Sequence, residues 1–142
     1  SADVALVTLQ TEFFGARVLL VEDEPINQEV ATMILEEAGL LVTVASNGLE
    51  AVALARQGGF DLILMDMQMP EMDGLEACRR IRQLPGWAQR PIVAMTANAF
   101  AEDKERCFQA GLDDFITKPV DPEHLFEVVL RWLIIGRAST PA

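Results

Sequence analysis

Residues 17 to 25 are Arg17-Val18-Leu19-Leu20-Val21-Glu22-Asp23-Glu24-Pro25, an apolar run that ends in three acidic residues and a proline. An apolar run without polar alternation is typical of a strand that is buried on both faces of a parallel sheet. Proline is tolerated in the first turn of a helix, so a helix is predicted to begin at Pro25. The regular structure is therefore expected to start with a buried strand followed by a helix.

The same alternation of short apolar runs and longer helical stretches continues along the chain. Capping and stop residues separate the elements, as Asn47 and Gly58 do around the second helix. We expect strands at residues 17–21, 41–44, 61–65 and 91–95 and around 115–116, and helices at 25–38, between 47 and 58, at 75–84, at 100–110 and at 122–135. Five strands that alternate with helices predict parallel pairing with right-handed crossovers, and hence a doubly wound α/β sheet.

A chain of 142 residues is long enough for one domain with its own core, which we place at residues 17–136. Residues 1–16 are too apolar for an ordinary tail, and we interpret them as a linker or tail from an upstream region. Residues 137–142 are expected to form a C-terminal tail. The chain begins with Ser1 rather than Met and shows no secretory signal, so we expect the natural protein to be longer.

The charge balance excludes several kinds of partner. Eleven Lys and Arg face twenty-two Asp and Glu, which gives a net charge of −11. This balance argues against direct binding to nucleic acid or to an anionic membrane surface, and no apolar run is long enough to cross a bilayer. Cys78 and Cys107 are interpreted as core residues in a reducing compartment. A cytoplasmic location is expected, with a membrane anchor elsewhere in the parent chain left open.

Polar residues follow the predicted strands where each strand ends. Glu22 and Asp23 follow the first strand, Asp66 the third and Thr96 the fourth, and Lys118 lies near the end of the fifth. Ligands bind at the carboxyl ends of the strands in open α/β sheets, so these side chains are expected to converge. Three neighbouring carboxylates repel one another unless a cation lies between them, and a few hard oxygen ligands suit Mg²⁺.

Several enzyme classes lack their required residues. The acidic turn after the first strand has no glycine, which argues against a dinucleotide site or a phosphate-binding loop. No Gly-x-Ser-x-Gly motif is present, and the single histidine, His124, is expected on an exposed part of the last helix. An aspartate nucleophile, Asp66, beside a metal and Lys118 remains, which is the arrangement for accepting a phosphoryl group.

In this order, the site residues and their neighbours resemble the receiver domain of two-component response regulators, and most closely the receivers of hybrid sensor histidine kinases. The resemblance covers residues 16–133 and implies the flavodoxin-like (β/α)5 receiver fold. The matching stretches are Val21-Glu22-Asp23, Met65-Asp66-Met67-Gln68-Met69-Pro70-Glu71-Met72-Asp73-Gly74, Met95-Thr96-Ala97-Asn98 and Thr117-Lys118-Pro119.

The resemblance implies a metal-dependent phosphoacceptor. Asp66 corresponds to the residue that takes the phosphoryl group from a phosphohistidine. Glu22 and Asp23 correspond to the acidic pair that holds Mg²⁺ or Mn²⁺ together with Asp66, and the backbone carbonyl of Gln68 is a further ligand. Such a domain catalyses its own phosphorylation and dephosphorylation, and the parent chain of such a receiver is itself often a histidine kinase.

The resemblance also implies a switch and partners. Thr96 and Lys118 would bind phosphoryl oxygens, and Thr96 would act with Phe115, which stands where the family often has tyrosine. The chain has no tyrosine, so a switch signal through a phenolic hydroxyl is absent. The implied partners are a histidine kinase, a histidine-containing phosphotransfer protein, or both.

Two other functions remain open from the sequence. An aspartyl-phosphate phosphatase of the dehalogenase class usually has a second aspartate two residues after the nucleophile, whereas this chain has Gln68 there. A degenerate receiver would only dock partners, which the complete acidic set argues against. Mixing with Mg²⁺ and acetyl phosphate distinguishes the three, because only a receiver gains a labile acyl phosphate.

The first predicted helix carries a candidate docking surface for the histidine donor. Ile26, Val30 and Met33 form a second apolar stripe besides the one that the core requires. We assign Val30 to a widened core and expect Ile26 and Met33 to be exposed beside the pocket.

Three further expectations concern other parts of the chain. The last helix is apolar on more than one side, which predicts a homodimer or interdomain contact. Arg79, Arg80 and Arg82 are interpreted as a solvated face. The peptide bond between Lys118 and Pro119 is predicted to be cis, because X–Pro bonds tolerate this geometry.

Overall fold

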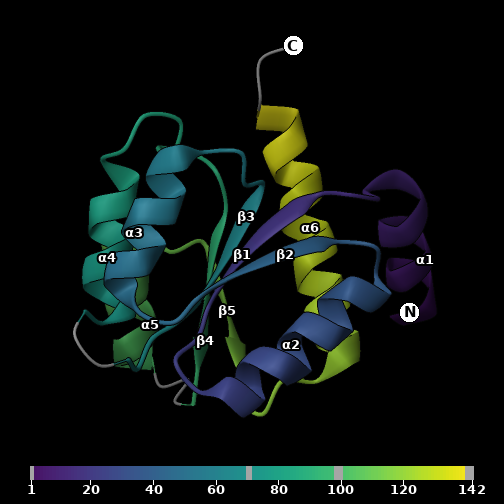
Figure 1. Cartoon of the computed structure of the whole chain (residues 1–142), viewed down its shortest axis with the longest axis horizontal. Helices are drawn as coiled ribbons and strands as arrows, with labels where there is room; N and C mark the ends of the chain where they lie inside the picture. The colour runs from purple at the N-terminus through teal and green to yellow at the C-terminus, as the bar shows by residue number, and fades with distance from the viewer. Residues whose placement is uncertain (1, 70–71, 98–100, 140–142) are drawn as a thin grey trace.

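The protein is a five-stranded parallel sheet with helices on both faces (Figure 1). The computed structural model describes residues 2–69, 72–97 and 101–139. The strand order is β2-β1-β3-β4-β5. Successive strands are added on one side of β1 and then on the other, so the strand order reverses between β1 and β3. The elements are α1 (Ala2–Glu12), β1 (Arg17–Val21), α2 (Pro25–Glu37), β2 (Leu41–Ala45), α3 (Gly48–Gln57), β3 (Leu62–Asp66), α4 (Gly74–Arg82), β4 (Ile92–Thr96), α5 (Ala101–Ala110), β5 (Asp114–Thr117) and α6 (Pro122–Ser139).

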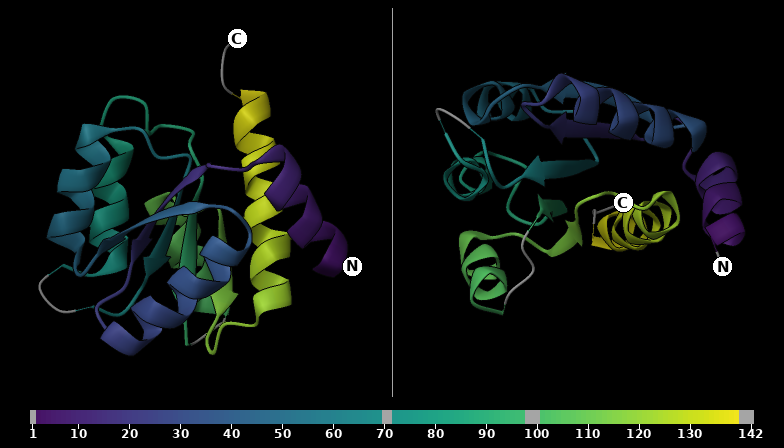
Figure 2. Two further views of the ribbon diagram at one scale, coloured as in Figure 1. Left: turned by 45° about the vertical axis from the view of Figure 1, so that its right-hand side comes forward. Right: turned by 90° about the horizontal axis from the view of Figure 1, so that it is seen from below.

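Alternate residues of each strand pack into opposite layers, because side chains along a strand point to the two faces in turn. In β1, Val18 and Leu20 belong to the core shared with α1, α2 and α6, whereas Leu19 and Val21 belong to the core shared with α3, α4 and α5. Figure 2 shows these two helical layers on either side of the sheet. The predicted doubly wound α/β architecture is confirmed.

Local signals place most of the element boundaries as predicted. The Asn47 side chain accepts a hydrogen bond from the backbone N–H of Glu50 at 2.9 Å, which caps α3, and Gly58 ends this helix with φ +79°. The strands β3 and β4 are shifted one residue toward the C-terminus from their predicted positions. Asp66 and Thr96 are therefore the last residues of their strands rather than the first residues after them.

Helix α1 was not predicted. It packs along α6 with Ala5 and Leu9 buried, and the Phe13 ring lies beneath the guanidinium of Arg137 at 4.0 Å. The β-branched residues of α1 lower its helix propensity, so packing against α6 provides the stability that the local sequence lacks. Part of the excess apolar surface of α6 is thus covered by this segment of the same chain.

The arginines of α4 differ in their surroundings. Arg79 and Arg80 are exposed, as expected. The prediction was wrong for Arg82, whose guanidinium donates to the carbonyls of Gly111 and Trp87 and pairs with Asp113 at 2.8 Å. Because α4 ends at this residue, its side chain reaches over the edge of the layer to loops that are distant in sequence. No helix in the described part of the chain has the length and apolar character that a membrane crossing requires.

Candidate functional site

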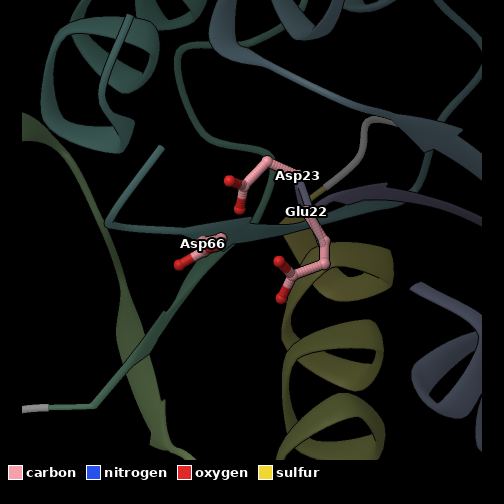
Figure 3. A group of neighbouring side chains, drawn as sticks. All are labelled: Glu22, Asp23 and Asp66. Carbon is pink, nitrogen blue, oxygen red and sulfur yellow. The ribbon is translucent and has the colours of Figure 1, made fainter. Parts of the chain in front are cut away.

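The residues predicted to converge lie together at the carboxyl edge of the sheet. Glu22 and Asp23 directly follow β1, Asp66 ends β3, Thr96 ends β4, and Lys118 directly follows β5. The backbone N–H of Lys118 donates to the carbonyl of Thr96 at 2.8 Å, which holds the last strand end beside its neighbour. Figure 3 shows Glu22, Asp23 and Asp66 gathered at this edge.

One ammonium group faces two buried carboxylates. The Nζ of Lys118 lies 2.9 Å from Oε1 of Glu22 and 3.2 Å from Oδ1 of Asp66. Both acidic residues are only 2% exposed. Burial lowers the pKa of Lys118, but its hydrogen bond to Glu22 and its attraction to both carboxylates outweigh this effect and raise the pKa above its ordinary value. Lys118 therefore stays positively charged near neutral pH.

The Asp66 carboxyl has an unusually high proton affinity. Burial raises its pKa from 3.8 to about 6, and the nearby negative charge of Glu22 acts in the same direction. A hydrogen bond from the backbone N–H of Gln68 and the charge of Lys118 oppose this rise but do not cancel it. The pocket thus contains more negative charge than its own lysine compensates.

This excess negative charge suits a divalent cation. Glu22, Asp23 and Asp66 each offer one carboxylate oxygen, and these oxygens lie within 4.8 Å of one another. Asp23 is more open to solvent than the other two, which leaves a path for an ion and its waters. Carboxylate oxygens are the ligands that Mg²⁺ and Mn²⁺ prefer, and two or three of them leave room for water and a phosphoryl oxygen. The residues present therefore fit such an ion.

Two residues without a predicted role hold the site in place. The side-chain amide of Gln28 donates to the backbone carbonyl of Glu22 at 2.6 Å, which ties α2 to the acidic turn. At Gly74, a Cβ atom would lie 2.7 Å from the carbonyl oxygen of Asp66, so only glycine allows α4 to start this close to the strand end. Gly74 belongs to a stretch that carries the family resemblance, but its role and that of Gln28 depend on tertiary contacts and were not assigned from the sequence.

The segments around Lys118 include a confirmed cis peptide bond and an aromatic contact. The Lys118–Pro119 peptide bond is cis, as predicted. Phe115 is half-buried in β5, and its ring centroid lies 5.5 Å from that of Phe108. The Nζ of Lys104 lies 4.7 Å from the centre of the Phe115 ring. An aromatic ring and a cation therefore cover this side of β5.

Helix α2 presents an apolar stripe beside the acidic turn. Ile26 is 67% exposed and Met33 is 66% exposed, as predicted. The assignment of Val30 to the core was wrong, because this side chain is 48% exposed. Helical spacing explains the result, since Val30 lies four residues after Ile26 and three before Met33 and thus shares their face. The core contact of α2 is made by the opposite stripe, with Ala31 and Leu35 buried.

The cysteines, two of the methionines and the histidine lie where a structural role places them. Cys78 and Cys107 are buried and form no disulfide with each other, and burial raises the pKa of the Cys78 thiol to about 11, which disfavours the nucleophilic thiolate. Met65 and Met72 pack in the core beside α3 and α4. His124 is exposed in the first turn of α6.

The chain is similar to receiver domains of sensor histidine kinases in both sequence and fold. It is 44% identical over 128 residues to the signal transduction histidine-protein kinase BarA of Escherichia coli. This match covers 87% of this chain but only 14% of BarA. The crystal structure of the receiver domain of sensor histidine kinase PA1611 from Pseudomonas aeruginosa, with a magnesium ion in its active site cleft, has a TM-score of 0.79 and 41% identity. That match covers 84% of this chain and 98% of the other.

A third match involves a complex with a partner. The co-crystal structure of the Saccharomyces cerevisiae histidine phosphotransfer signaling protein Ypd1 and the receiver domain of its response regulator Ssk1 matches with a TM-score of 0.77 and 33% identity, covering 85% of this chain and 90% of the other. The model of the response regulator receiver domain family matches residues 18–130. With this match over most of its length, the chain belongs to the response regulator receiver domain family.

Proposed function

We propose that the chain accepts a phosphoryl group from a phosphohistidine on Asp66 and that the transfer requires Mg²⁺ or Mn²⁺. The observation that carries this proposal is the buried Asp66 carboxylate, which lies within ion-pair distance of Lys118 and beside the carboxylates of Glu22 and Asp23. The magnesium ion in the active site cleft of the PA1611 receiver supports the choice of metal.

Each site residue has a separate role in the phosphoryl transfer. An oxygen of Asp66 attacks the phosphorus atom, the new O–P bond forms as the N–P bond breaks, and the electron pair returns to the imidazole ring. Glu22, Asp23, Asp66 and the backbone carbonyl of Gln68 would hold the metal ion, which would neutralise charge on the transferred group. Lys118 already stands 3.2 Å from Oδ1 of Asp66 and pairs with a phosphoryl oxygen.

The response to phosphorylation passes through Thr96 and Phe115. Thr96 ends β4, the strand next to β3, which supports the proposal that its hydroxyl donates a hydrogen bond to a phosphoryl oxygen on Asp66. Phe115 lies on the neighbouring strand β5 and is only half-buried, which leaves its ring room to change position. The switch in this chain therefore moves an aromatic ring without a hydroxyl group, and it changes which partners bind to the β5 side.

The partner we propose is a histidine kinase or a histidine-containing phosphotransfer protein. Ypd1 pairs with a receiver domain in the yeast complex, which supports this class of partner. Ile26 and Met33 lie on the helix that follows the acidic turn, so a helical bundle that docks on them brings its imidazole toward Asp66.

The chain spans about one seventh of the length of BarA, so the whole protein is a matter of proposal. We propose a hybrid histidine kinase that contains this receiver at residues 17–136, joined by residues 1–16 to the region before it. We also propose that the receiver itself is cytoplasmic, whether or not the parent chain is anchored in a membrane. The last helix remains a candidate for a homodimer or interdomain contact, since Ile134 and Ile135 are still 50% and 42% exposed.

Phosphotransfer from a histidine protein tests the proposal. Phosphorylated Ypd1 and phosphotransfer domains of hybrid kinases serve as a panel of donors, and the fastest donor is used for the variants. Ile26→Ala and Met33→Ala are each expected to raise the KM for this donor about fivefold, because each removes an exposed apolar contact. Labelling by acetyl phosphate, which needs no docking surface, is expected to stay unchanged.

Leu49→Ala is the matched control, because Leu49 is 51% exposed on α3 in the opposite helical layer. A chain that is labelled by acetyl phosphate but by no donor in the panel contradicts the proposed partner. A chain that is labelled by neither is a degenerate receiver. Wild-type KM values for both α2 variants place the docking surface elsewhere.

A further inference from the structure

Helix α1 is apolar on two sides, but the described structure covers only one of them. Ala5 and Leu9 face α6 and are buried, whereas Val4 and Val7 on the other side are 61% and 54% exposed. The helix also precedes residue 18, where the match to the receiver family begins, so it is an addition to the shared fold.

One stripe of α1 lies on the side that faces α2. Val7 and Gln10 lie at i and i+3 on α1, and Phe14 lies in the turn just after the helix. The side-chain amide of Gln10 donates to the carbonyl of Glu37, the last residue of α2, at 2.9 Å. Phe14 is 78% exposed and packs against the turn after α2, where a Cβ on Gly39 would lie 3.0 Å from its ring.

The exposed stripe of α2 leads to the same junction. Ile26, Val30 and Met33 are exposed at i, i+4 and i+7, and Glu37 continues this line at i+11. From Ile26 to Glu37 the helix rises about 16 Å, at 1.5 Å per residue. The stripe therefore begins at the rim of the acidic pocket and ends where Gln10 joins α1 to α2. We call the two stripes together the extended apolar face, which consists of Ile26, Val30, Met33, Val7 and Phe14.

The charge around this face is negative. Glu29 and Glu36 are exposed and fall beside the stripe of α2, and Glu37 lies at its end. Glu12 is exposed near the end of α1. A partner that fits this surface presents apolar side chains in its centre and Lys or Arg at its edge. The same face of a second copy of this chain carries the same acidic residues, so two copies do not fit each other through it.

We propose that α1 extends the docking surface for the histidine-bearing partner, so that one helix of a helical bundle lies along α2 and its far end contacts Val7 and Phe14. This proposal rests on the proposed function, since it concerns the same phosphodonor. The contact at the far end fixes the rotation of the bundle about Asp66 and selects among donors, because receivers without such a helix cannot make it. Val7 and Phe14 are docking residues and take no part in the phosphoryl transfer itself.

Phosphotransfer with the donor panel described above tests this extension. Val7→Ser and Phe14→Ser are each expected to raise the KM for the protein donor about threefold to fivefold, with an unchanged kcat at saturation. Acetyl phosphate labelling and the unfolding midpoint in urea are expected to match the wild type, because both side chains are exposed. Leu49→Ser controls for the loss of an exposed apolar side chain elsewhere.

Each outcome separates the two proposals. If Ile26→Ala and Met33→Ala raise the KM but Val7→Ser and Phe14→Ser do not, the extension is wrong and the docking surface ends on α2. If none of the four has an effect, the proposed partner surface itself is wrong. If Phe14→Ser lowers stability, Val7→Ser decides alone, since Val7 lies within the helix and away from the turn. Self-association of the wild type that Val7→Ser abolishes also overturns the extension, because a second copy then occupies this face.

Discussion

Replacing Asp66 by asparagine should stabilise the metal-free protein, because this carboxylate is buried in a pocket with excess negative charge. Its pKa is raised from 3.8 to about 6. Since a tenfold change in proton affinity corresponds to about 1.4 kcal/mol, the ionised form costs the folded state about 3 kcal/mol. Asparagine has nearly the same shape and carries no charge, so Asp66→Asn removes this cost.

The sign of the pH dependence follows from the direction of the shift. At about pH 4, the folded protein holds the Asp66 proton, and the carboxylate costs little. As the pH rises from about 4 to about 6, the unfolded chain loses this proton more readily than the folded protein does, and stability falls. The variant should therefore be more stable than the wild type by about 3 kcal/mol at pH 7.5 and nearly equal to it at pH 4.

Urea unfolding in EDTA at several pH values measures this difference. Glu127→Gln, which neutralises an exposed carboxylate on α6, is the control and should show little change at any pH. Adding Mg²⁺ should stabilise the wild type and narrow the gap, because the ion compensates the same charge. Equal stability of Asp66→Asn and wild type at pH 7.5, or a difference that does not vary with pH, would refute the reasoning.

Four further predictions follow from the contacts described. Lys118→Met leaves the carboxylates of Glu22 and Asp66 without their ammonium and should cost about 3 kcal/mol in EDTA at neutral pH, less near pH 5, as measured by urea unfolding. Saturating Mg²⁺ should raise the melting temperature at neutral pH, and a scan to lower pH should show the effect fading near pH 6, where protons compete for Asp66. Arg82→Met should cost about 2 to 4 kcal/mol in urea unfolding while acetyl phosphate labelling persists, because the lost bonds lie away from the site. Leu9→Ala should cost about 2 to 4 kcal/mol and speed amide exchange in α1, and unchanged exchange would mean that α1 is not held by this side chain.

The sequence was sufficient to predict the sheet and the site because both follow from local patterns. The apolar runs at β1 and β3 have no polar alternation, and strands of this kind are buried on both faces. Parallel strands bring their carboxyl ends to one edge, so Glu22, Asp66 and Lys118 could be placed together without any knowledge of the helices. Strand boundaries were displaced by one residue at Asp66, which did not change the edge on which it lies.

The features that the sequence missed depend on contacts between distant segments. Arg82 stands in a run of arginines, which is typical of a solvated helix face. Only the fold brings the carbonyls of Trp87 and Gly111 within reach of its guanidinium, which donates hydrogen bonds to both. Helix α1 contains several β-branched residues and depends on α6 for its apolar contact, so its stability is a tertiary effect. Val30 was predicted to be buried but is exposed. The sequence pattern shows that a helix stripe is apolar, but it does not show whether another segment covers that stripe.

Mapping the phosphoryl group that acetyl phosphate adds tests the central role of Asp66 most directly. In the presence of Mg²⁺, intact mass should show one phosphoryl group per chain that hydroxylamine removes, as expected for an acyl phosphate, and peptide mapping should place it on Asp66. EDTA should suppress the label, and Asp66→Asn should abolish it. A label on another residue, or one that persists undiminished in Asp66→Asn, would contradict the account.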